Sequence, residues 1–274
     1  MLERPVVNTG LKTEDTIALA RAKHQMENIS GVMRTLNKIG STIEFGLSKL
    51  PESKQAWLNA QVHKALMFVL KSNLKTMKKG QEFRKPSDNT YRALVTTSGV
   101  LGGVFGPAAF AADLTIATKF MMRSIIDIAR SEGEDIYDPE TQLSCLEVFA
   151  LGGRSPDDDG LETGYYATRL ALNAGIRQAA DFVAKNGISE IGKLLISSTN
   201  PLVKVVAIIA SRFSVQVSEK FMAQAVPVAG AVGGGTVNFV FIQHFQKMAR
   251  AHFVIRRLER SYGFETVKKA YELV

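Results

Sequence analysis

The stretch VAGAVGGGTVNFVFIQHFQKMARAHFVIRRLERSY, residues 228–262, decides the fold class. Small and apolar residues recur along it in alternating steps of four and three, which is typical of one long helix with a single buried face. The recurring positions are Gly230, Gly234, Val237, Phe241, His244, Met248, Ala251, Ile255, Leu258 and Tyr262. At 1.5 Å per residue this pattern predicts a C-terminal helix about 50 Å long, glycine-rich at its start and basic at its end.

The rest of the chain has the same helical spacing and no alternating apolar and polar run bounded by hairpin turns. We therefore expect an all-α fold, a multi-helix bundle. Start and stop signals, such as Pro51 in a first helical turn and Asn186 with Gly187 at a helix end, divide the chain into segments. The predicted helices cover residues 13–30, 31–50, 51–79, 139–151, 161–185 and 213–225, and a break at 199–201 divides 188–210 into two short buried helices.

Two long stretches, residues 93–112 and 221–246, carry no formal charge. The first is as long as a membrane span, but only seven of its residues are Leu, Val or Phe, and Gly106 with Pro107 interrupts it. Pro227 interrupts the second. Glycines four residues apart allow two helix backbones to approach closely, in lipid or in a protein core. We expect glycine-rich apolar helical hairpins here.

The formal net charge of +8 is unevenly distributed along the 274 residues. Residues 1–90 have 15 Lys+Arg and 8 Asp+Glu, residues 91–190 have 8 and 14, and residues 191–274 have 11 and 4. Basic ends around an acidic middle, without zinc-finger spacing or an aromatic-rich ribonucleoprotein strand, argue against nucleic acid as the partner. The single cysteine, Cys145, excludes an internal disulfide and is expected to be a small core residue.

The polar segment 84–88 is the best linker candidate, so we expect an N-terminal basic helical region, 1–86, and a helical core, 87–274, integrated in one domain. The predicted helix 51–79 has lysines on one side and apolar residues on the other, so it could lie on an anionic membrane or pack on the core with solvated lysines. Residues expected to face a membrane or another anion are Lys64, Lys71, Lys75, Lys78, Arg256, Arg257 and Arg260.

Acidic residues gather in two segments, 131–140 and 154–160. Clustered carboxylates can hold Ca²⁺ or Mg²⁺, but neither segment has the twelve-residue calcium-loop pattern, and capping and solvation are the better interpretation. We therefore predict no metal site. Asp113, which ends the first charge-free stretch among apolar neighbours, is expected to be a buried carboxylate with a partner. His244 and His252 lie too far apart along a helix to share a metal, and each is expected to be a hydrogen-bonded packing residue in the core.

Several blocks in order along the chain resemble the EcsC protein family. They include 99–106 (GVLGGVFG), 145–155 (CLEVFALGGRS), 162–166 (ETGYY), 217–220 (VSEK) and 244–250 (HFQKMAR), and the resemblance extends over most of the chain from about residue 40. It implies a bacterial protein of a family named for a gene beside those of an ABC transporter, with no established molecular function and no agreed catalytic motif. The residues in these and intervening blocks that we take as candidate functional residues are Asp113, Glu132, Glu134, Asp135, Glu147, Tyr165, Asn238 and His244.

Our leading hypothesis is a non-enzymatic accessory protein without a cofactor, cytoplasmic and peripheral at the inner membrane, which meets an anionic membrane surface or a membrane protein complex. The polar residues 1–8 do not resemble a secretion leader. One alternative is a metal-dependent hydrolase that uses Glu132, Asp135 and Glu147. Another is a soluble helical bundle that binds a lipid or small ligand.

Overall fold

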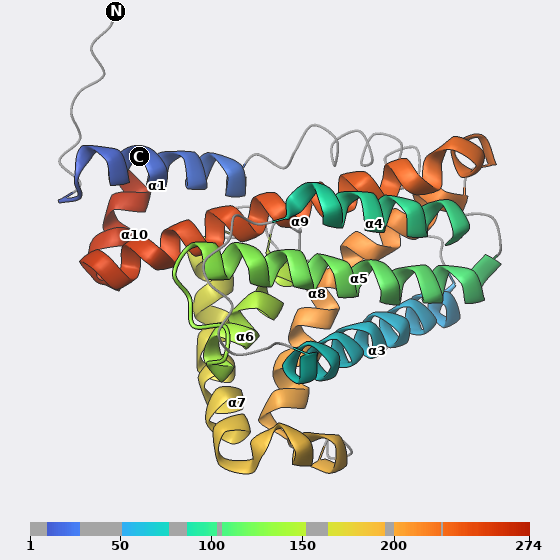
Figure 1. The fold of residues 1–274 in the computed structure, drawn as a ribbon, viewed down its shortest axis with the longest axis horizontal. Helices are drawn as coiled ribbons and strands as arrows, with labels where there is room; N and C mark the ends of the chain where they lie inside the picture. Colours follow the sequence, from blue (N-terminus) through green and yellow to red (C-terminus); the bar gives the residue numbers. More distant parts are fainter. Residues whose placement is uncertain are drawn as a thin grey trace, which may run out of the picture.

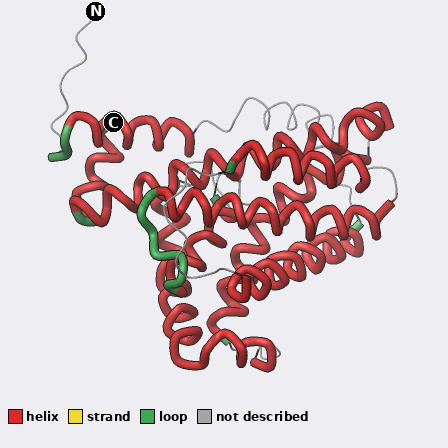
Figure 2. The backbone as a smooth tube through the Cα atoms, viewed as in Figure 1, coloured by secondary structure: helices red, strands yellow, loops and turns green. Residues whose placement is uncertain are grey.

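The computed structural model describes residues 10–27, 51–76, 87–102, 106–151, 164–194, 200–225 and 227–274. Within these ranges all regular structure is helical, as the sequence predicted, and no strand occurs (Figure 2). The helices are α1 (Thr13–Glu27), α3 (Glu52–Thr76), α4 (Asp88–Gly102), α5 (Gly106–Ser131), α6 (Pro139–Glu147), the short 3₁₀ helix η1 (Val148–Ala150), α7 (Tyr165–Leu194), α8 (Pro201–Ala225), α9 (Pro227–Tyr262) and α10 (Phe264–Leu273).

The long helix α9 organises the bundle (Figure 1). It has 36 residues and packs against α1, α4, α5, α8 and α10, which confirms the predicted long C-terminal helix. Its stripe from Val237 to Leu258 is buried at each of the seven positions that the sequence pattern named, because these positions share one helical face.

Both charge-free stretches form helical hairpins, as predicted. In the first, α4 ends at Gly102 and α5 begins at Gly106, with Pro107 in its first turn. In the second, α8 ends at Ala225 and α9 begins at Pro227. Figure 1 shows both turns at the same end of the molecule, which we call the hairpin end. The acidic segment 132–138 and the C-terminal half of α9 lie toward the opposite end.

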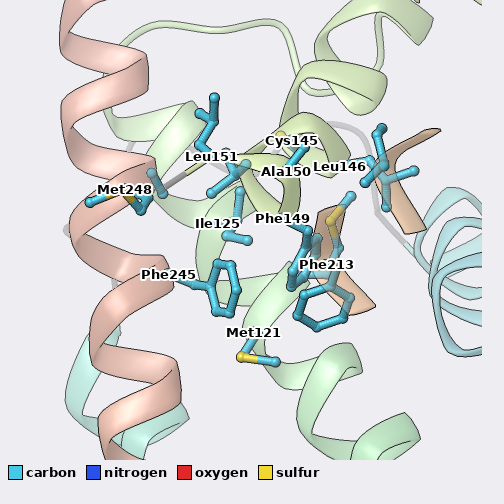
Figure 3. Packing of buried hydrophobic residues seen from close by; sticks show 14 of the residues in the cluster. Met121, Ile125, Cys145, Leu146, Phe149, Ala150, Leu151, Phe213, Phe245 and Met248 are labelled. Atoms are coloured by element: carbon cyan, nitrogen blue, oxygen red, sulfur yellow. The ribbon is translucent and has the colours of Figure 1, made fainter. Parts of the chain in front are cut away.

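Aromatic rings from three elements form the centre of the core (Figure 3). Phe149 of η1 lies 4.9 Å from Phe213 of α8 and 5.1 Å from Phe245 of α9, measured between ring centroids. Cys145 is buried beside them, which confirms its expected place in the core, and burial raises the pKa of its thiol far above the usual range. The thiol is therefore neutral and inaccessible.

Two of the predicted helix boundaries were wrong. Helix α7 continues past Asn186 and Gly187 to Leu194, and Asn186 Nδ2 donates to the Phe182 carbonyl of its own helix, 2.8 Å away. The break at 199–201 is confirmed, with Asn200 Oδ1 accepting from the Leu202 amide, but α8 is one helix of 25 residues where we expected a short segment. A capping preference contributes only about 1 kcal/mol, so the surrounding fold can override it.

Helices α7 and α8 approach closely at Gly175. A Cβ added at this glycine would lie 2.8 Å from Val205 Cγ2, closer than carbon atoms in contact can come. A larger residue here would require Val205 or the two helices to shift, so the glycine allows this close approach.

Helix α3 has the predicted amphipathic arrangement where its side chains are described. Leu66, Val69 and Leu70 are buried and Lys64 is exposed. The side chains of Lys71 and Lys75, all of Lys78, the predicted helix 31–50 and the second acidic segment 154–160 lie outside the described residues.

Candidate functional site

The four helices of the two hairpins share one buried polar contact, which we call the hairpin cluster. Asp113 of α5 accepts from Lys220 Nζ of α8 at 2.8 Å and from Asn238 Nδ2 of α9 at 2.8 Å. Asn238 Nδ2 also donates to the Val95 carbonyl of α4 at 2.9 Å. The predicted buried, partnered carboxylate at Asp113 is confirmed.

The hairpin cluster is shielded from water. The Lys220 and Asp113 side chains are 0% and 1% exposed, and the ammonium lies 5.7 Å from the Phe110 ring centroid and 5.6 Å from that of Phe241. Burial lowers the pKa of Lys220, and the charge and hydrogen bond of Asp113 oppose that shift. Taking both charges out of water costs several kcal/mol per ion, so the pair contributes more to specific geometry than to net stability.

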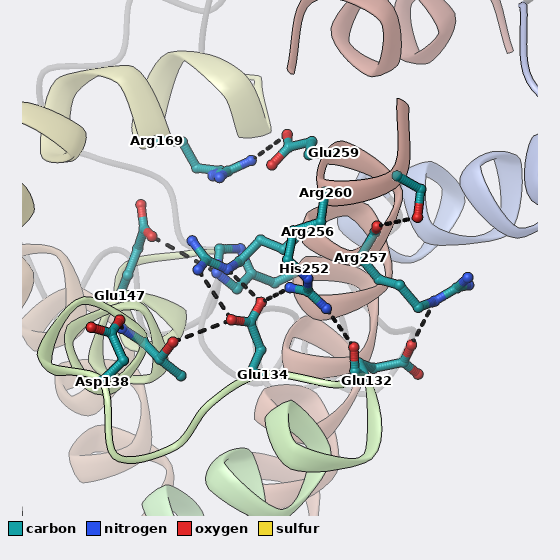
Figure 4. A network of polar contacts seen from close by, with 12 residues as sticks. Glu132, Glu134, Asp138, Glu147, Arg169, His252, Arg256, Arg257, Glu259 and Arg260 are labelled. Atoms are coloured by element: carbon teal, nitrogen blue, oxygen red, sulfur yellow. Dashed lines mark hydrogen bonds and ion pairs between the residues drawn. The ribbon is translucent and has the colours of Figure 1, made fainter. Parts of the chain in front are cut away.

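A second polar cluster, the arginine network, surrounds Glu134 at the opposite end (Figure 4). Arg256 of α9 donates to both Glu134 oxygens, at 2.8 and 3.2 Å, and Arg260 donates to Oε1. Thr141 Oγ1 adds a fourth hydrogen bond at 3.2 Å. Burial alone would raise the pKa of Glu134, but Arg256 and Arg260 outweigh it and hold this pKa below its usual value.

The network continues to the first helix of the chain. Arg257 Nε donates to Glu132 Oε2 at 3.0 Å, and Arg257 also lies 3.6 Å from Asp15 of α1. Tyr262 donates its hydroxyl to Asp15 at 2.6 Å. Arg256, Arg257 and Arg260 are thus paired with carboxylates of this chain, which leaves little of their charge for an external anion. That these arginines face a membrane stays a prediction.

Glu147, His252 and Tyr165 form a buried row beside the arginine network. The Tyr165 hydroxyl lies 3.0 Å from His252 Nδ1, and His252 Nε2 lies 3.8 Å from Glu147 Oε2. Burial raises the pKa of Glu147 to about 7, with partial opposition from Arg169 and Arg256. Burial, aided by the same two arginines, lowers the pKa of His252 well below its usual value. Near neutral pH the histidine is uncharged, and Glu147 is near its titration midpoint.

Arg169 links this row to α9 and α10. It donates to Glu259 at 2.6 Å, and its guanidinium lies 5.3 Å from the Tyr165 ring centroid and 6.0 Å from that of Phe264. Tyr166 donates to the same Glu259 oxygen at 3.0 Å. These contacts hold the start of α7 against the end of α9. The charges of Arg169 and Glu259 are thus paired with each other within the chain.

The remaining candidates stand apart from these clusters. His244 is buried on α9, and both of its ring nitrogens are without a hydrogen-bond partner in the described structure. Burial, and secondarily Lys247, lower its pKa to about 4. Asp135 is exposed and accepts from the Tyr137 amide in a turn at 2.9 Å. Across the described part of the chain, no three His, Cys, Asp or Glu side chains come together as a metal-binding group.

Comparison with known protein families identifies the family of this chain. The sequence matches the EcsC protein family over residues 15–258. The chain belongs to the EcsC protein family. No curated protein and no solved structure matches it. The EcsC match crosses the boundary that we predicted at residue 86, and the division into two regions stays a prediction.

The EcsC blocks named from the sequence contribute to the hairpin cluster and to the contacts beside the arginine network. Block 217–220 provides Lys220 for the hairpin cluster, and block 162–166 provides Tyr165 and Tyr166 beside Glu259. Sequence reasoning missed Lys220 as a site residue, although one signal was present. Asp113 follows the first charge-free stretch directly, and Lys220 directly precedes the second. His252, which we expected to be a hydrogen-bonded packing residue, is confirmed as one by its contact with Tyr165, and it also lies beside Glu147. The hydrogen bond that we expected for His244 is not found among the described residues.

Proposed function

We propose that this EcsC protein is a non-enzymatic accessory protein, cytoplasmic and peripheral at the inner membrane, whose hairpin end enters the surface of an anionic bilayer. One observation carries the proposal. The two charge-free hairpins turn at the same end of the molecule, while the carboxylates and arginines pair with one another toward the other end (Figures 1 and 4).

Three of the hairpin helices expose large apolar side chains. Leu94 of α4, Ile116 of α5 and Phe239 of α9 are 41%, 45% and 39% exposed. On α5 the exposed positions Ala108 and Ala112 precede Ile116 at steps of four, so they line one side of the helix. Apolar side chains on a charge-free surface favour the boundary between lipid headgroups and acyl chains.

Two further features support contact with a bilayer surface. Trp57, in the first part of α3, lies 6.4 Å from Phe110 and 6.2 Å from Phe221 between ring centroids, and tryptophan is enriched at membrane interfaces. The exposed Lys64 on the same helix can approach lipid phosphates.

One stretch of the described helices, Pro201–Ser218 in α8, is long and apolar enough to cross a bilayer, and 50% of it is buried within the protein. A core helix of a water-soluble protein meets the same criterion. The proposal is therefore surface insertion of the hairpin end, without a spanning helix.

Flotation on vesicles tests the proposal. Purified protein is mixed at low salt with phosphatidylcholine vesicles, with or without phosphatidylglycerol, and Trp57, the only tryptophan, reports apolar contact by a blue shift of its fluorescence. We expect flotation and a blue shift only with the anionic lipid. Protein that stays at the bottom with both vesicle types and shows no shift would end the proposal.

Matched charge insertions sharpen this test. Ala112→Glu places a carboxylate on the exposed face of α5, and Ala174→Glu makes the same change on the exposed face of α7, away from the hairpin end (Figure 1). A carboxylate next to an anionic lipid surface is repelled by about 1 kcal/mol, so Ala112→Glu should weaken vesicle binding about fivefold. Ala174→Glu should bind as the unaltered protein does.

The hydrolase alternative has less support from the geometry. Glu132 pairs with Arg257, Glu147 is buried next to His252, and Asp135 is exposed in a turn, so the three carboxylates that we considered serve different contacts.

A further inference from the structure

The hairpin cluster is one polar point of contact to which all four hairpin helices contribute. Val95 of α4, Asp113 of α5, Lys220 of α8 and Asn238 of α9 contribute one group each. Phe110 and Phe241 cover the ammonium from α5 and α9. Separation of the α4–α5 hairpin from the α8–α9 hairpin must therefore break the Asp113 contacts to Lys220 and Asn238.

The cluster lies at a defined depth below the hairpin end. Asp113 is seven residues from the start of α5, and Lys220 is five residues from the end of α8. At 1.5 Å per residue these positions lie about 10 Å and about 8 Å along their helices. An interfacial segment enters the headgroup boundary by about 5–10 Å, so Asp113 and Lys220 would lie near the lipid phosphates after insertion. Asn238, eleven residues from the start of α9, lies farther along its helix.

The energetics of the pair suit reversible contact. Asp113 and Lys220 lose their hydration when the hairpins close, and this loss offsets much of their attraction. When the hairpins separate at a bilayer surface, Lys220 can extend to lipid phosphates, and Asp113 can return to water. Apolar side chains of similar size in place of the pair would regain no hydration when the hairpins separate. They would therefore hold the hairpins together more tightly.

We propose that the hairpin cluster is a lock that holds the two hairpins together in solution and opens when the hairpin end enters an anionic bilayer. This inference rests on the proposed membrane association and concerns how that association is controlled. The polar groups make closure specific, because only one register satisfies Asp113 from both α8 and α9, and they keep closure reversible.

Thiol labelling can follow the lock directly. Ala117 is fully buried on α5, one turn beyond Asp113, so the thiol of an Ala117→Cys variant is expected to react with maleimide only when the hairpins separate. Cys145, 1% exposed in α6, is a second thiol in the same molecule and reports unfolding of the whole core. Peptide mass spectrometry separates the two rates.

In the Ala117→Cys background we expect phosphatidylglycerol vesicles to speed labelling at position 117 and leave labelling at Cys145 unchanged. Asp113→Asn should speed labelling at 117 even without lipid, because the amide loses the ion pair with Lys220. Asp113→Leu combined with Lys220→Met should slow labelling at 117 about tenfold with or without vesicles, since apolar groups in place of the pair are expected to favour the closed state.

Equal rates at position 117 in Asp113→Asn and the unaltered cluster, without lipid, would overturn the lock. Acceleration of both thiols by the same factor would also overturn it, because both thiols would then be exposed by unfolding of the whole core. The labelling rates of the Asp113→Asn variant are measured without a membrane, so they test the lock alone. Failure of the unaltered protein to float with vesicles would reject the membrane proposal. The two proposals can therefore fail separately.

Discussion

Lys220 Nζ lies 2.8 Å from Asp113 Oδ2 although the two residues are 107 positions apart in sequence, and neither side chain is more than 1% exposed. Each residue borders one of the two charge-free stretches. The pair thus connects the two hairpins at the charged residue that borders each charge-free stretch. Removal of either partner leaves the other charge buried without its ion pair.

Lys220→Met should therefore lower the free energy of unfolding by about 3–5 kcal/mol, because Asp113 loses its ion pair in a site closed to water. Lys220→Arg should not restore stability, since a guanidinium is larger and needs a different donor geometry. Urea unfolding followed by circular dichroism measures both. Lys204→Met, an exposed change on the same helix, is the control. Equal losses for Lys204→Met and Lys220→Met would contradict the prediction.

Glu147→Gln should change how stability depends on pH. The pKa of Glu147 is raised to about 7 in the folded protein, so the folded state holds the proton more tightly than the unfolded chain does. Stability from this group is complete below about pH 4.5 and is lost as the pH rises to about 7. The Gln variant should match the parent near pH 4.5 and exceed it above pH 7 by on the order of 3 kcal/mol.

Urea unfolding between pH 4.5 and 8 measures how the free energy of unfolding depends on pH in the parent and in the Glu147→Gln variant. His252 contributes to both proteins with the opposite slope, since its pKa is lowered, and this contribution cancels in the comparison. Parallel curves for the two proteins would show that Glu147 does not titrate in this range.

His244→Leu should stabilise the protein by about 1–2 kcal/mol at pH 7, because it removes two buried ring nitrogens that have no hydrogen-bond partner among the described residues. The gain should increase as the pH falls from 6.5 toward 4. The pKa of His244 is about 4 in the folded state, so the parent loses stability when the unfolded chain binds the proton first.

His252→Leu is the comparison variant for His244→Leu, because it removes a buried histidine that has contacts. His252 contacts Tyr165 and Glu147, so its removal should destabilise the protein at pH 7. Thermal melts at pH 7 and pH 5 compare the two variants. A loss of stability in His244→Leu would contradict the prediction.

Glu134→Gln should destabilise the protein by about 2–4 kcal/mol, because Arg256 and Arg260 lose the carboxylate they share. Asp135→Asn changes the neighbouring carboxylate, which is exposed and accepts only the Tyr137 amide among the contacts described. Asparagine can still accept that hydrogen bond, so this control should cost less than about 0.5 kcal/mol. Similar melting temperatures for the two variants would argue against the arginine network as a stabilising contact.

Gly175→Ala should gain little from its better helix propensity, because the new methyl group meets Val205 at 2.8 Å. Val205→Ala makes room for that methyl group. A double-mutant cycle on these two positions should give a coupling energy of about 1–2 kcal/mol in favour of the pair. If the stability effects of the two substitutions were additive, α7 and α8 would be able to move apart slightly without a loss of stability.

Much of the fold could be predicted from periodicity. The stripe from Val237 to Leu258 predicted α9 because burial against several helices sets its spacing, and Pro107 and Pro227 marked the hairpin turns because proline ends helices. The helix end at Asn186 was predicted wrongly, since capping is a weak local preference and the helix continued past it.

The candidate sites were harder to predict, because periodicity shows which face of a helix is polar but not what packs against it. Asp113 was predicted as a buried, partnered carboxylate, but its partner Lys220 comes from a helix 107 residues away. Likewise Arg256 and Arg260 form a basic helix end in sequence, and only the fold brings Glu134 to them.

Asn238 and Arg256 belong to the same helix, α9, 18 residues apart, which corresponds to about 27 Å. No proline lies between them, so this segment has no built-in hinge of the usual kind. A tilt of α9 at the hairpin end is then carried along a stiff helix to Arg256 and, through Arg257 and Asp15, to α1. Movement at one end of the bundle is therefore transmitted to the other end by the stiffness of α9 alone.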